Sequence, residues 1–287
     1  MAEDRYAFLR ELDLFADETH KPFYWQPEPL QRKTPAALLI HGFPGTPADM
    51  RPMGHSFLAA GWVAHAPLLP GFGPGIATLP ERRFTEWVEV VREEAAQLRR
   101  DHEVVVVVGH SMGAAFTVLA TAAERVSAQV LLAPYWRFGG PAQTMLWPVL
   151  RWVARRWRPL RAVDLDEERI RDGIRQFGPE IDLDDALTRE RLRDLVVPTE
   201  LLDELRRLGD ATNRMAPRSD VPTLVVQGMR DGMVRPRDTD RLIRRLPCVA
   251  GYELLDSTHR IVDQDDGAWE RVERAVMKFA QPFADGR

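Results

Sequence analysis

The sequence predicts an α/β fold in which a mostly parallel central sheet is flanked by helices and interrupted by an inserted helical region. Short apolar runs that do not alternate with polar residues predict strands buried on both faces. The clearest is 103–109, which contains five consecutive valines. Longer amphipathic stretches separate these runs, and such alternation is typical of a parallel sheet. A Trp- and Arg-rich stretch, 135–219, breaks the alternation and contains no clear buried strand.

Composition and charge are those of a globular protein. The chain has 287 residues, of which 45% are hydrophobic and 29% charged. The net charge of −4 does not favour nucleic acid as a partner. One cysteine, Cys248, excludes an intrachain disulfide and a metal site built on cysteines. The charged N-terminal segment is not a signal peptide, and no apolar run approaches the roughly 20 residues of a membrane span. We therefore expect a soluble, cytoplasmic protein.

The elements before the valine run follow from hydrophobic patterning. The apolar segments AALLIHGF (36–43) and GWVAHAPLLPG (61–71) predict two strands. Between 82 and 100, apolar residues recur at helical spacing with a charged opposite face, which predicts a helix. His102 follows in a charged stretch and is expected to be solvated.

The remaining core elements come after the valine run. The Ala-rich segment 112–124 predicts a tightly packed helix. Three further apolar runs predict strands, and GAWERVERAVMKFAQPF predicts a closing helix. The strands are expected at 128–134, 222–228 and 251–256. The core is thus predicted to comprise 1–134 and 220–287, with 135–219 as a helical cap.

The start of the predicted cap is rich in aromatic residues near the strand ends, where ligand sites of such sheets form. We consider them candidate substrate-binding residues, and packing of the cap on the core is the alternative role. They are Tyr135, Trp136, Phe138, Trp147 and Trp152. Met233, in the loop after 222–228, is a further candidate. Basic residues beside the tryptophans leave open a transient contact with an anionic membrane surface; they are Arg151, Arg155, Arg156 and Arg158.

A nucleophile is indicated by GHSMG at 109–113, which lies between a predicted strand and a predicted helix. Gly-x-Ser-x-Gly in this context is typical of a nucleophile elbow, a strained turn that exposes the serine Oγ above the sheet. Ser111 is therefore the candidate nucleophile. Gly109 and Gly113 are expected to leave room for the strand and helix that pass close to the turn.

A serine needs a base, and the base needs a carboxylate. His259 follows the last predicted strand and is the only histidine after His110. His110 itself is expected to point away from the site. Asp231 follows the strand 222–228 and is the candidate acid, with a solvated turn residue as the alternative. Asp256 is close to His259 in sequence, and Asp238 lies further from the strand.

An oxyanion hole requires two donors. The backbone N–H of Met112, at a predicted helix N-terminus, is one candidate. The backbone N–H of Phe43, in the loop IHGFPGTP, is the other. His41 in this loop is expected to have a structural role and to bond the backbone.

Together these motifs resemble the α/β-hydrolase superfamily, and within it bacterial carboxylesterases and monoacylglycerol lipases. The similarity rests on LLIHGFPGTPADM, APLLPGFG, VVVGHSMG, LVVQGMRDGMV and DSTHRIVDQD, which lie within 36–113 and 222–266. Two departures are PGFG, where relatives often have Pro-Gly-His-Gly, and Arg260, where they often have an apolar residue. Residues 135–219 resemble no family pattern.

The resemblance implies a serine hydrolase that cleaves carboxylic esters, with apolar short-to-medium acyl groups, and that needs no metal or organic cofactor. An amidase or aminopeptidase, a thioesterase and a carbon–carbon bond hydrolase use the same scaffold. A ligand-binding receptor or lipid carrier that retains the three residues is the alternative from another class.

Overall fold

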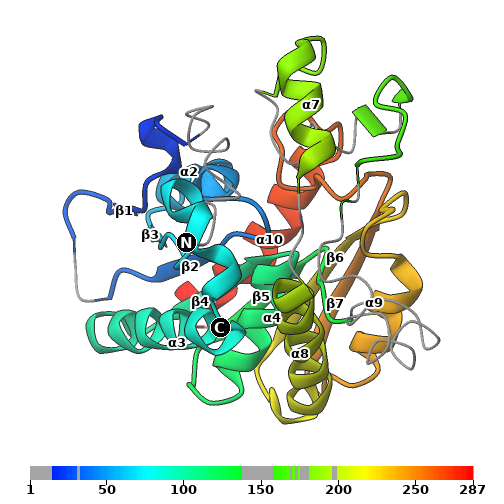
Figure 1. Ribbon diagram of the computed structural model, residues 1–287. Coiled ribbons are helices and arrows are strands. Elements are labelled where there is room, and N and C mark those ends of the chain that lie inside the picture. Colours follow the sequence, from blue (N-terminus) through cyan, green and yellow to red (C-terminus); the bar gives the residue numbers. More distant parts are fainter. Residues whose placement is uncertain are drawn as a thin grey trace.

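One mixed sheet forms the centre of the molecule (Figure 1). The computed structural model describes residues 15–30, 33–137, 158, 160–168, 170–171, 174, 181–195 and 199–286. Its seven strands have the order β1-β3-β2-β4-β5-β6-β7. They are β1 (Phe23–Trp25), β2 (Ala36–Ile40), β3 (Val63–Ala66), β4 (Val105–His110), β5 (Ala128–Leu132), β6 (Thr223–Gly228) and β7 (Val249–Leu255). Each neighbouring pair is parallel except β1 and β3.

The α/β fold and its mostly parallel sheet are confirmed, and all six predicted strands are present. Strand β3 is shorter than predicted, because the prolines and glycine at 67–71 follow it in an irregular segment. Strand β1 was not predicted. It has three residues and pairs antiparallel at the edge of the sheet, so it is too short for a periodic pattern.

Helices cover both faces of the sheet (Figure 1). The predicted helices at 82–100, at 112–124 and at the C-terminus are all present. The α-helices are α2 (Arg51–Ala59), α3 (Phe84–Asp101), α4 (Met112–Thr121), α7 (Ala186–Asp194), α8 (Thr199–Met215), α9 (Pro236–Ile243) and α10 (Trp269–Ala284). Short 3-10 helices are η1 (Glu18–His20), η2 (Pro47–Met50), η3 (Gly73–Glu81) and η4 (Ala216–Arg218). In the described part of the chain, none of the helices has the length and apolar character that a membrane span needs.

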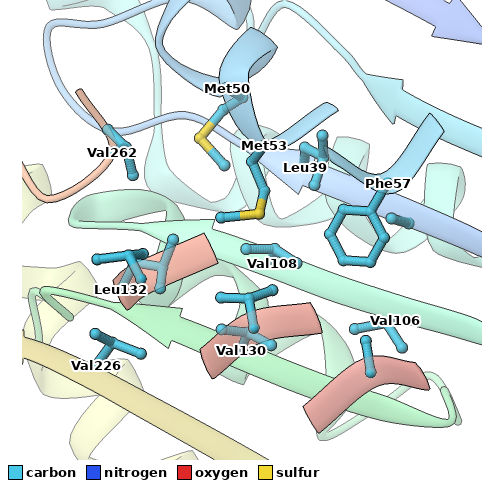
Figure 2. Close-up of a cluster of buried hydrophobic side chains, with 14 of the residues drawn as sticks. Leu39, Met50, Met53, Phe57, Val106, Val108, Val130, Leu132, Val226 and Val262 are labelled. Carbon is cyan, nitrogen blue, oxygen red and sulfur yellow. The ribbon is translucent and has the colours of Figure 1, made fainter. Parts of the chain in front are cut away.

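The valine strand β4 is buried on both faces, as its lack of alternation predicts. Val106 and Val108 lie in one apolar cluster with residues of α2 and α10 (Figure 2). Val105 and Val107 face the opposite way, into a cluster with residues of α3, α4 and α8. The strand that leads to the GHSMG turn is therefore held rigidly from both sides.

Helix α8 lies within the predicted cap but packs on the core. Leu201, Leu208 and Ala211 belong to the apolar cluster that α3 and α4 form with the sheet. The carboxylate of Glu204 also accepts a hydrogen bond from the backbone N–H of Phe84, the first residue of α3, at 3.0 Å. The division into core and cap stays a prediction, with 199–215 attached to the sheet layer.

His102 is not solvated, so that expectation was wrong. Its side chain is buried, and its Nδ1 lies 2.8 Å from the carbonyl oxygen of Thr34. Its Nε2 lies 3.4 Å from the hydroxyl of Tyr24. These partners come from the segment around β1 and β2, which the local charge pattern does not reveal.

Candidate active site

Ser111 occupies the turn between β4 and α4 in a strained conformation, with φ 53° and ψ −115°. Positive φ is unfavourable for a residue with a side chain, and such strain is found at functional sites. The two flanking glycines make the turn possible. A Cβ on Gly113 would lie 2.3 Å from the Ile40 carbonyl oxygen, and one on Gly109 would lie 2.5 Å from that of Gly113. The expected need for glycine at both positions is confirmed.

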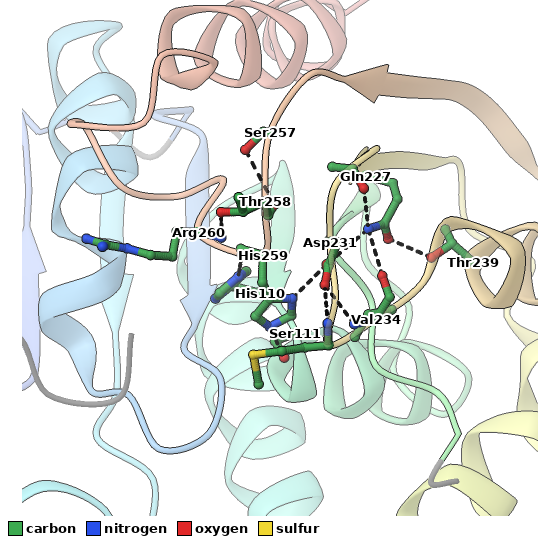
Figure 3. A network of polar contacts seen from close by, with 12 residues as sticks. His110, Ser111, Gln227, Asp231, Val234, Thr239, Ser257, Thr258, His259 and Arg260 are labelled. Carbon is green, nitrogen blue, oxygen red and sulfur yellow. Dashed lines mark hydrogen bonds and ion pairs between the residues drawn. The ribbon is translucent and has the colours of Figure 1, made fainter. Parts of the chain in front are cut away.

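The structure brings Ser111, His259 and Asp231 together (Figure 3). His259 Nδ1 lies 2.7 Å from Asp231 Oδ2, and His259 Nε2 lies 2.9 Å from Ser111 Oγ. A carboxylate only accepts hydrogen bonds, so the imidazole proton belongs on Nδ1 and Nε2 accepts from the serine. The three residues follow β4, β6 and β7, whose carboxyl ends share one edge of the sheet. Their catalytic role stays a prediction.

Asp231 is buried, with 4% of its surface exposed, so it is not a solvated turn residue. Its Oδ1 accepts from the backbone N–H groups of Met233 and Val234 at 2.8 and 2.7 Å. The other two acids lie elsewhere: Asp256 pairs with Arg230 at 2.7 Å and Asp238 pairs with Arg241 at 3.1 Å. The structure thus places Asp231 beside His259.

Gln227 is a buried partner of Asp231 that the sequence analysis did not identify. Its Nε2 lies 3.0 Å from Asp231 Oδ2 and 3.1 Å from the Val234 carbonyl oxygen. Its Oε1 accepts from the Thr239 hydroxyl at 2.6 Å. A glutamine inside the apolar strand TLVVQG, four residues before the candidate acid, is the signal that could have revealed it.

The loop that contains Phe43 lies against the nucleophile. A Cβ on Gly42 would be 3.0 Å from Ser111 Cβ and 3.1 Å from the His110 carbonyl oxygen, so glycine favours this close approach. Met112 is the first residue of α4, where backbone N–H groups lack helical partners. Among the described residues, neither the Phe43 nor the Met112 amide donates to a protein acceptor. Both amides are thus available to a ligand oxygen.

His41 has the structural role expected of it. Its Nδ1 lies 3.0 Å from the Gly42 carbonyl oxygen, and its Nε2 accepts from the Leu69 amide at 3.3 Å. Burial lowers the pKa of His41 to about 4, so the ring is neutral at physiological pH. It therefore fixes the loop without adding charge to the site.

His110 does not point away from the site, contrary to the expectation. Its Nε2 lies 3.1 Å from the backbone carbonyl oxygen of His259, and its side chain is buried. Burial, followed by the neighbouring His259, lowers the pKa of His110 to about 3. A neutral ring therefore bridges the nucleophile turn and the base loop.

Comparison with known proteins agrees with this architecture. The sequence profile of the alpha/beta hydrolase family matches residues 37–274, which is most of the chain. The chain belongs to the alpha/beta hydrolase family. It is 34% identical over 98 residues to a thermostable monoacylglycerol lipase of Bacillus sp. (strain H-257). That match covers 34% of this chain and 37% of the relative, so it spans little more than a third of the lipase.

Two solved structures are similar to this alpha/beta hydrolase in fold. One was described with the metagenome-derived lipolytic enzymes LipS and LipT; it has a TM-score of 0.67 and 20% identity, and covers 92% of this chain and 98% of that one. The other is the monoacylglycerol lipase of Paleococcus ferrophilus, with a TM-score of 0.64 and 17% identity; it covers 90% of this chain and 97% of that one. At these identities the similarity establishes the fold alone.

The candidate substrate-binding residues of this alpha/beta hydrolase occupy different places. The Tyr135 hydroxyl donates to the Leu205 carbonyl oxygen of α8 at 2.9 Å, and burial raises the pKa of Tyr135. Trp136 lies in an apolar cluster with residues of α4 and α9, which is the packing role left open for it. Met233 is half exposed beside Asp231. Phe138, Trp147 and Trp152 lie outside the described residues.

The basic residues considered for a membrane contact are also largely outside that part of the chain. Arg151, Arg155 and Arg156 are not among the described residues. Arg158 is described and pairs with Asp194 of α7 at 2.7 Å. Arg260 pairs with Asp263 and extends away from His259 (Figure 3). Across 15–30, 33–137 and the other described ranges, no cluster of three or more His, Cys, Asp and Glu side chains could hold a metal ion.

Proposed function

We propose that this alpha/beta hydrolase cleaves carboxylic esters through an acyl-enzyme formed on Ser111. The proposal rests on two hydrogen bonds: Ser111 Oγ lies 2.9 Å from His259 Nε2, and His259 Nδ1 lies 2.7 Å from Asp231 Oδ2. A serine, a base and an orienting carboxylate at these distances form the arrangement that activates a hydroxyl for acyl transfer. The partial similarity to a monoacylglycerol lipase supports an ester as the substrate.

In the first half-reaction, Ser111 Oγ attacks the ester carbonyl carbon and His259 Nε2 takes the hydroxyl proton. The Asp231 carboxylate stabilises the imidazolium through Nδ1–H. The bond from the carbonyl carbon to the leaving oxygen then breaks, and His259 passes its proton to the departing alcohol. In the second half-reaction, water attacks the acyl-enzyme with His259 again as the base, which releases the acid and restores Ser111.

The backbone amides of Phe43 and Met112 are the proposed oxyanion donors. Gly42 lets the first loop approach the Ser111 side chain, and Met112 begins helix α4, whose N-terminus favours negative charge. Preorganised donors of this kind act where charge develops in the transition state, and removal of one typically lowers the rate by about 10²–10³.

For the acyl group, we propose an apolar chain of short to medium length. The half-exposed Met233, whose amide bonds to Asp231, supplies apolar surface next to the acid. Each buried methylene contributes about 0.8 kcal/mol, so a few contacts are enough to set a chain-length preference. Shortening the side chain by Met233→Ala should lower kcat/KM for medium-chain esters more than for acetate esters.

Ser111→Ala tests the nucleophile. Because alanine fits the same backbone position, the variant should fold, while the rate should fall by on the order of 10⁶. A fluorophosphonate probe should label the parent at Ser111 and leave the variant unlabelled. Ser219→Ala removes another buried hydroxyl, which bonds to Gln129 in the core, and should keep labelling. Activity of Ser111→Ala within tenfold of the parent would contradict the proposal.

A substrate panel separates ester hydrolysis from the other chemistries of the scaffold. Esters, thioesters and peptide amides with the same acyl group should be assayed on one preparation. The proposal expects the highest kcat/KM for the ester and many turnovers per molecule. Preference for the thioester or amide would reassign the substrate class, and a single turnover without steady-state hydrolysis would indicate a ligand-binding protein.

A further inference from the structure

We propose that His110 is a positioning residue, which holds the main chain of His259 at the distance from Ser111 that proton transfer requires. The inference rests on the proposed function, because it assigns His259 the role of base. It extends that function to a residue whose motif position tolerates many side chains and whose side chain contacts neither the Ser111 hydroxyl nor Asp231 through a hydrogen bond.

Two hydrogen bonds join the nucleophile turn to the base loop in the described part of the chain. One is the reacting contact between Ser111 Oγ and His259 Nε2, which breaks when the proton moves. The other runs from His110 Nε2 to the His259 carbonyl oxygen at 3.1 Å, across 149 residues of sequence. The second contact involves none of the reacting atoms, so it can hold the loop beside the turn while the proton moves.

The His110 ring is dedicated to this contact. Its Nδ1 is buried without a hydrogen-bond partner among the described residues, whereas His41 uses both of its ring nitrogens. The His110 and His259 rings lie 5.2 Å apart and are tilted by 39°. On the acceptor side, the described residues offer the His259 carbonyl oxygen no donor other than His110. Removal of the imidazole would therefore leave that oxygen buried and unpaired.

The neutrality of His110 suits this role. The groups whose charge acts on its ring are His259, Asp231 and His41. His259 becomes an imidazolium during the proposed reaction, and a second cation 5.2 Å away would oppose that step. Burial keeps His110 uncharged. Because the His259 carbonyl oxygen can only accept, the one ring proton lies on Nε2, which donates the hydrogen bond.

Two amide variants separate the hydrogen bond from the volume of the side chain. The Nε2 of glutamine corresponds in reach to the Nε2 of histidine, whereas the Nδ2 of asparagine corresponds to Nδ1 and does not reach His259. His110→Asn should lower kcat and the rate of fluorophosphonate labelling by about 10- to 100-fold, because a small misplacement of the base has effects of this size. KM should change little. His110→Gln should recover most of both rates.

His102→Leu is the matched control. It removes a buried histidine that also bonds a backbone carbonyl, but at the opposite end of β4. It should lose stability and retain kcat. NMR of the low-field His259 Nδ1–H proton gives a second measurement, which a general loss of stability does not change. This signal should shift or broaden in His110→Asn. It should persist in His110→Gln and in His102→Leu.

Equal rates for His110→Asn and His110→Gln would overturn the inference. So would a loss of rate that is proportional to the loss of melting temperature across His110→Asn, His110→Gln and His102→Leu. If His110→Asn does not fold, His110→Met fills the apolar space without a donor and takes its place in the comparison. Failure of the proposed function has different results: Ser111→Ala would retain activity, or the substrate panel would show no steady-state ester hydrolysis, whatever the His110 variants do.

Discussion

Strand β4 has a buried histidine near each end, and the two perform different tasks. Before the strand, the Nδ1 of His102 bonds the carbonyl oxygen of Thr34 at 2.8 Å and ties the end of α3 to the neighbouring strand segment. At its carboxyl end, the Nε2 of His110 bonds the carbonyl oxygen of His259 at 3.1 Å. Both are buried imidazoles with a backbone acceptor, so the residue type does not distinguish them.

What differs is the surroundings. At the amino end, the contact between His102 and Thr34 is a buried structural hydrogen bond. At the carboxyl end, the turn contains Ser111 at φ 53°, and the amides of Phe43 and Met112 have no acceptor among the residues that the structure describes. Backbone strain of this kind is found at functional sites, and the packed valines between the two ends hold the turn in place. The comparison predicts that loss of the His110 contact lowers the rate and that loss of the His102 contact lowers the stability.

The largest effect is expected at the acid. Asp231→Asn should lower kcat by about 10⁴ with the fold retained, because the imidazole loses the partner that sets its tautomer. Hydrolysis of a p-nitrophenyl ester measures the rate, and circular dichroism checks the fold. Asp256→Asn and Asp238→Asn are controls, since both residues pair with arginines instead of His259. Greater damage from either control than from Asp231→Asn would contradict the assignment.

Steric crowding at the nucleophile turn should give the next effect. Gly113→Ala places a methyl group 2.3 Å from the Ile40 carbonyl oxygen, which is backbone and cannot rotate away. The free energy of unfolding should fall by about 3 kcal/mol, the upper range for overpacking. Urea unfolding measures the loss. At Gly267 a Cβ meets nothing within 4 Å, so Gly267→Ala should be nearly neutral. Equal stability of the two variants would contradict the described turn.

The amino end is tested by His102→Leu. Loss of the bond to Thr34 leaves a buried carbonyl without that donor, so the free energy of unfolding should fall by about 1–3 kcal/mol. Because the site lies beyond the other end of β4, kcat/KM should stay within about twofold, as expected for independent distant sites. A large loss of kcat at unchanged folded fraction would break the proposed contrast between the two ends.

The last effect concerns pH. His41 and His110 have pKa values lowered by burial from 6.5 to about 4 and about 3. The unfolded chain therefore binds more protons below pH 6.5, and the free energy of unfolding should decrease as the pH falls from 6.5 towards 4, by up to about 1 kcal/mol per pH unit for each histidine. Urea unfolding at several pH values measures the slope. His110→Gln should make it shallower, and an unchanged slope would contradict the neutral, buried state of His110.

Much of the site could be predicted because its signals are local. Ser111 sits between a valine strand and an Ala-rich helix, and the strain of that turn requires glycines at fixed spacing. Asp231 and His259 each follow an apolar run, and in a parallel sheet the carboxyl ends of such strands share one edge. The loop containing Phe43 follows the same rule. Strand order along the chain was thus enough to expect these residues at one edge.

Other features depended on the three-dimensional arrangement. The contact between His110 and His259 spans 149 residues, and the bond between Glu204 and Phe84 spans 120. Gln227 appears in sequence only as a polar residue near the end of an apolar strand, and β1 is too short to show a period. Such contacts depend on how loops of separate strands are spaced and rotated, which the register and packing of the whole sheet determine. Periodicity and spacing describe one segment at a time, so only the tertiary structure could identify the partners.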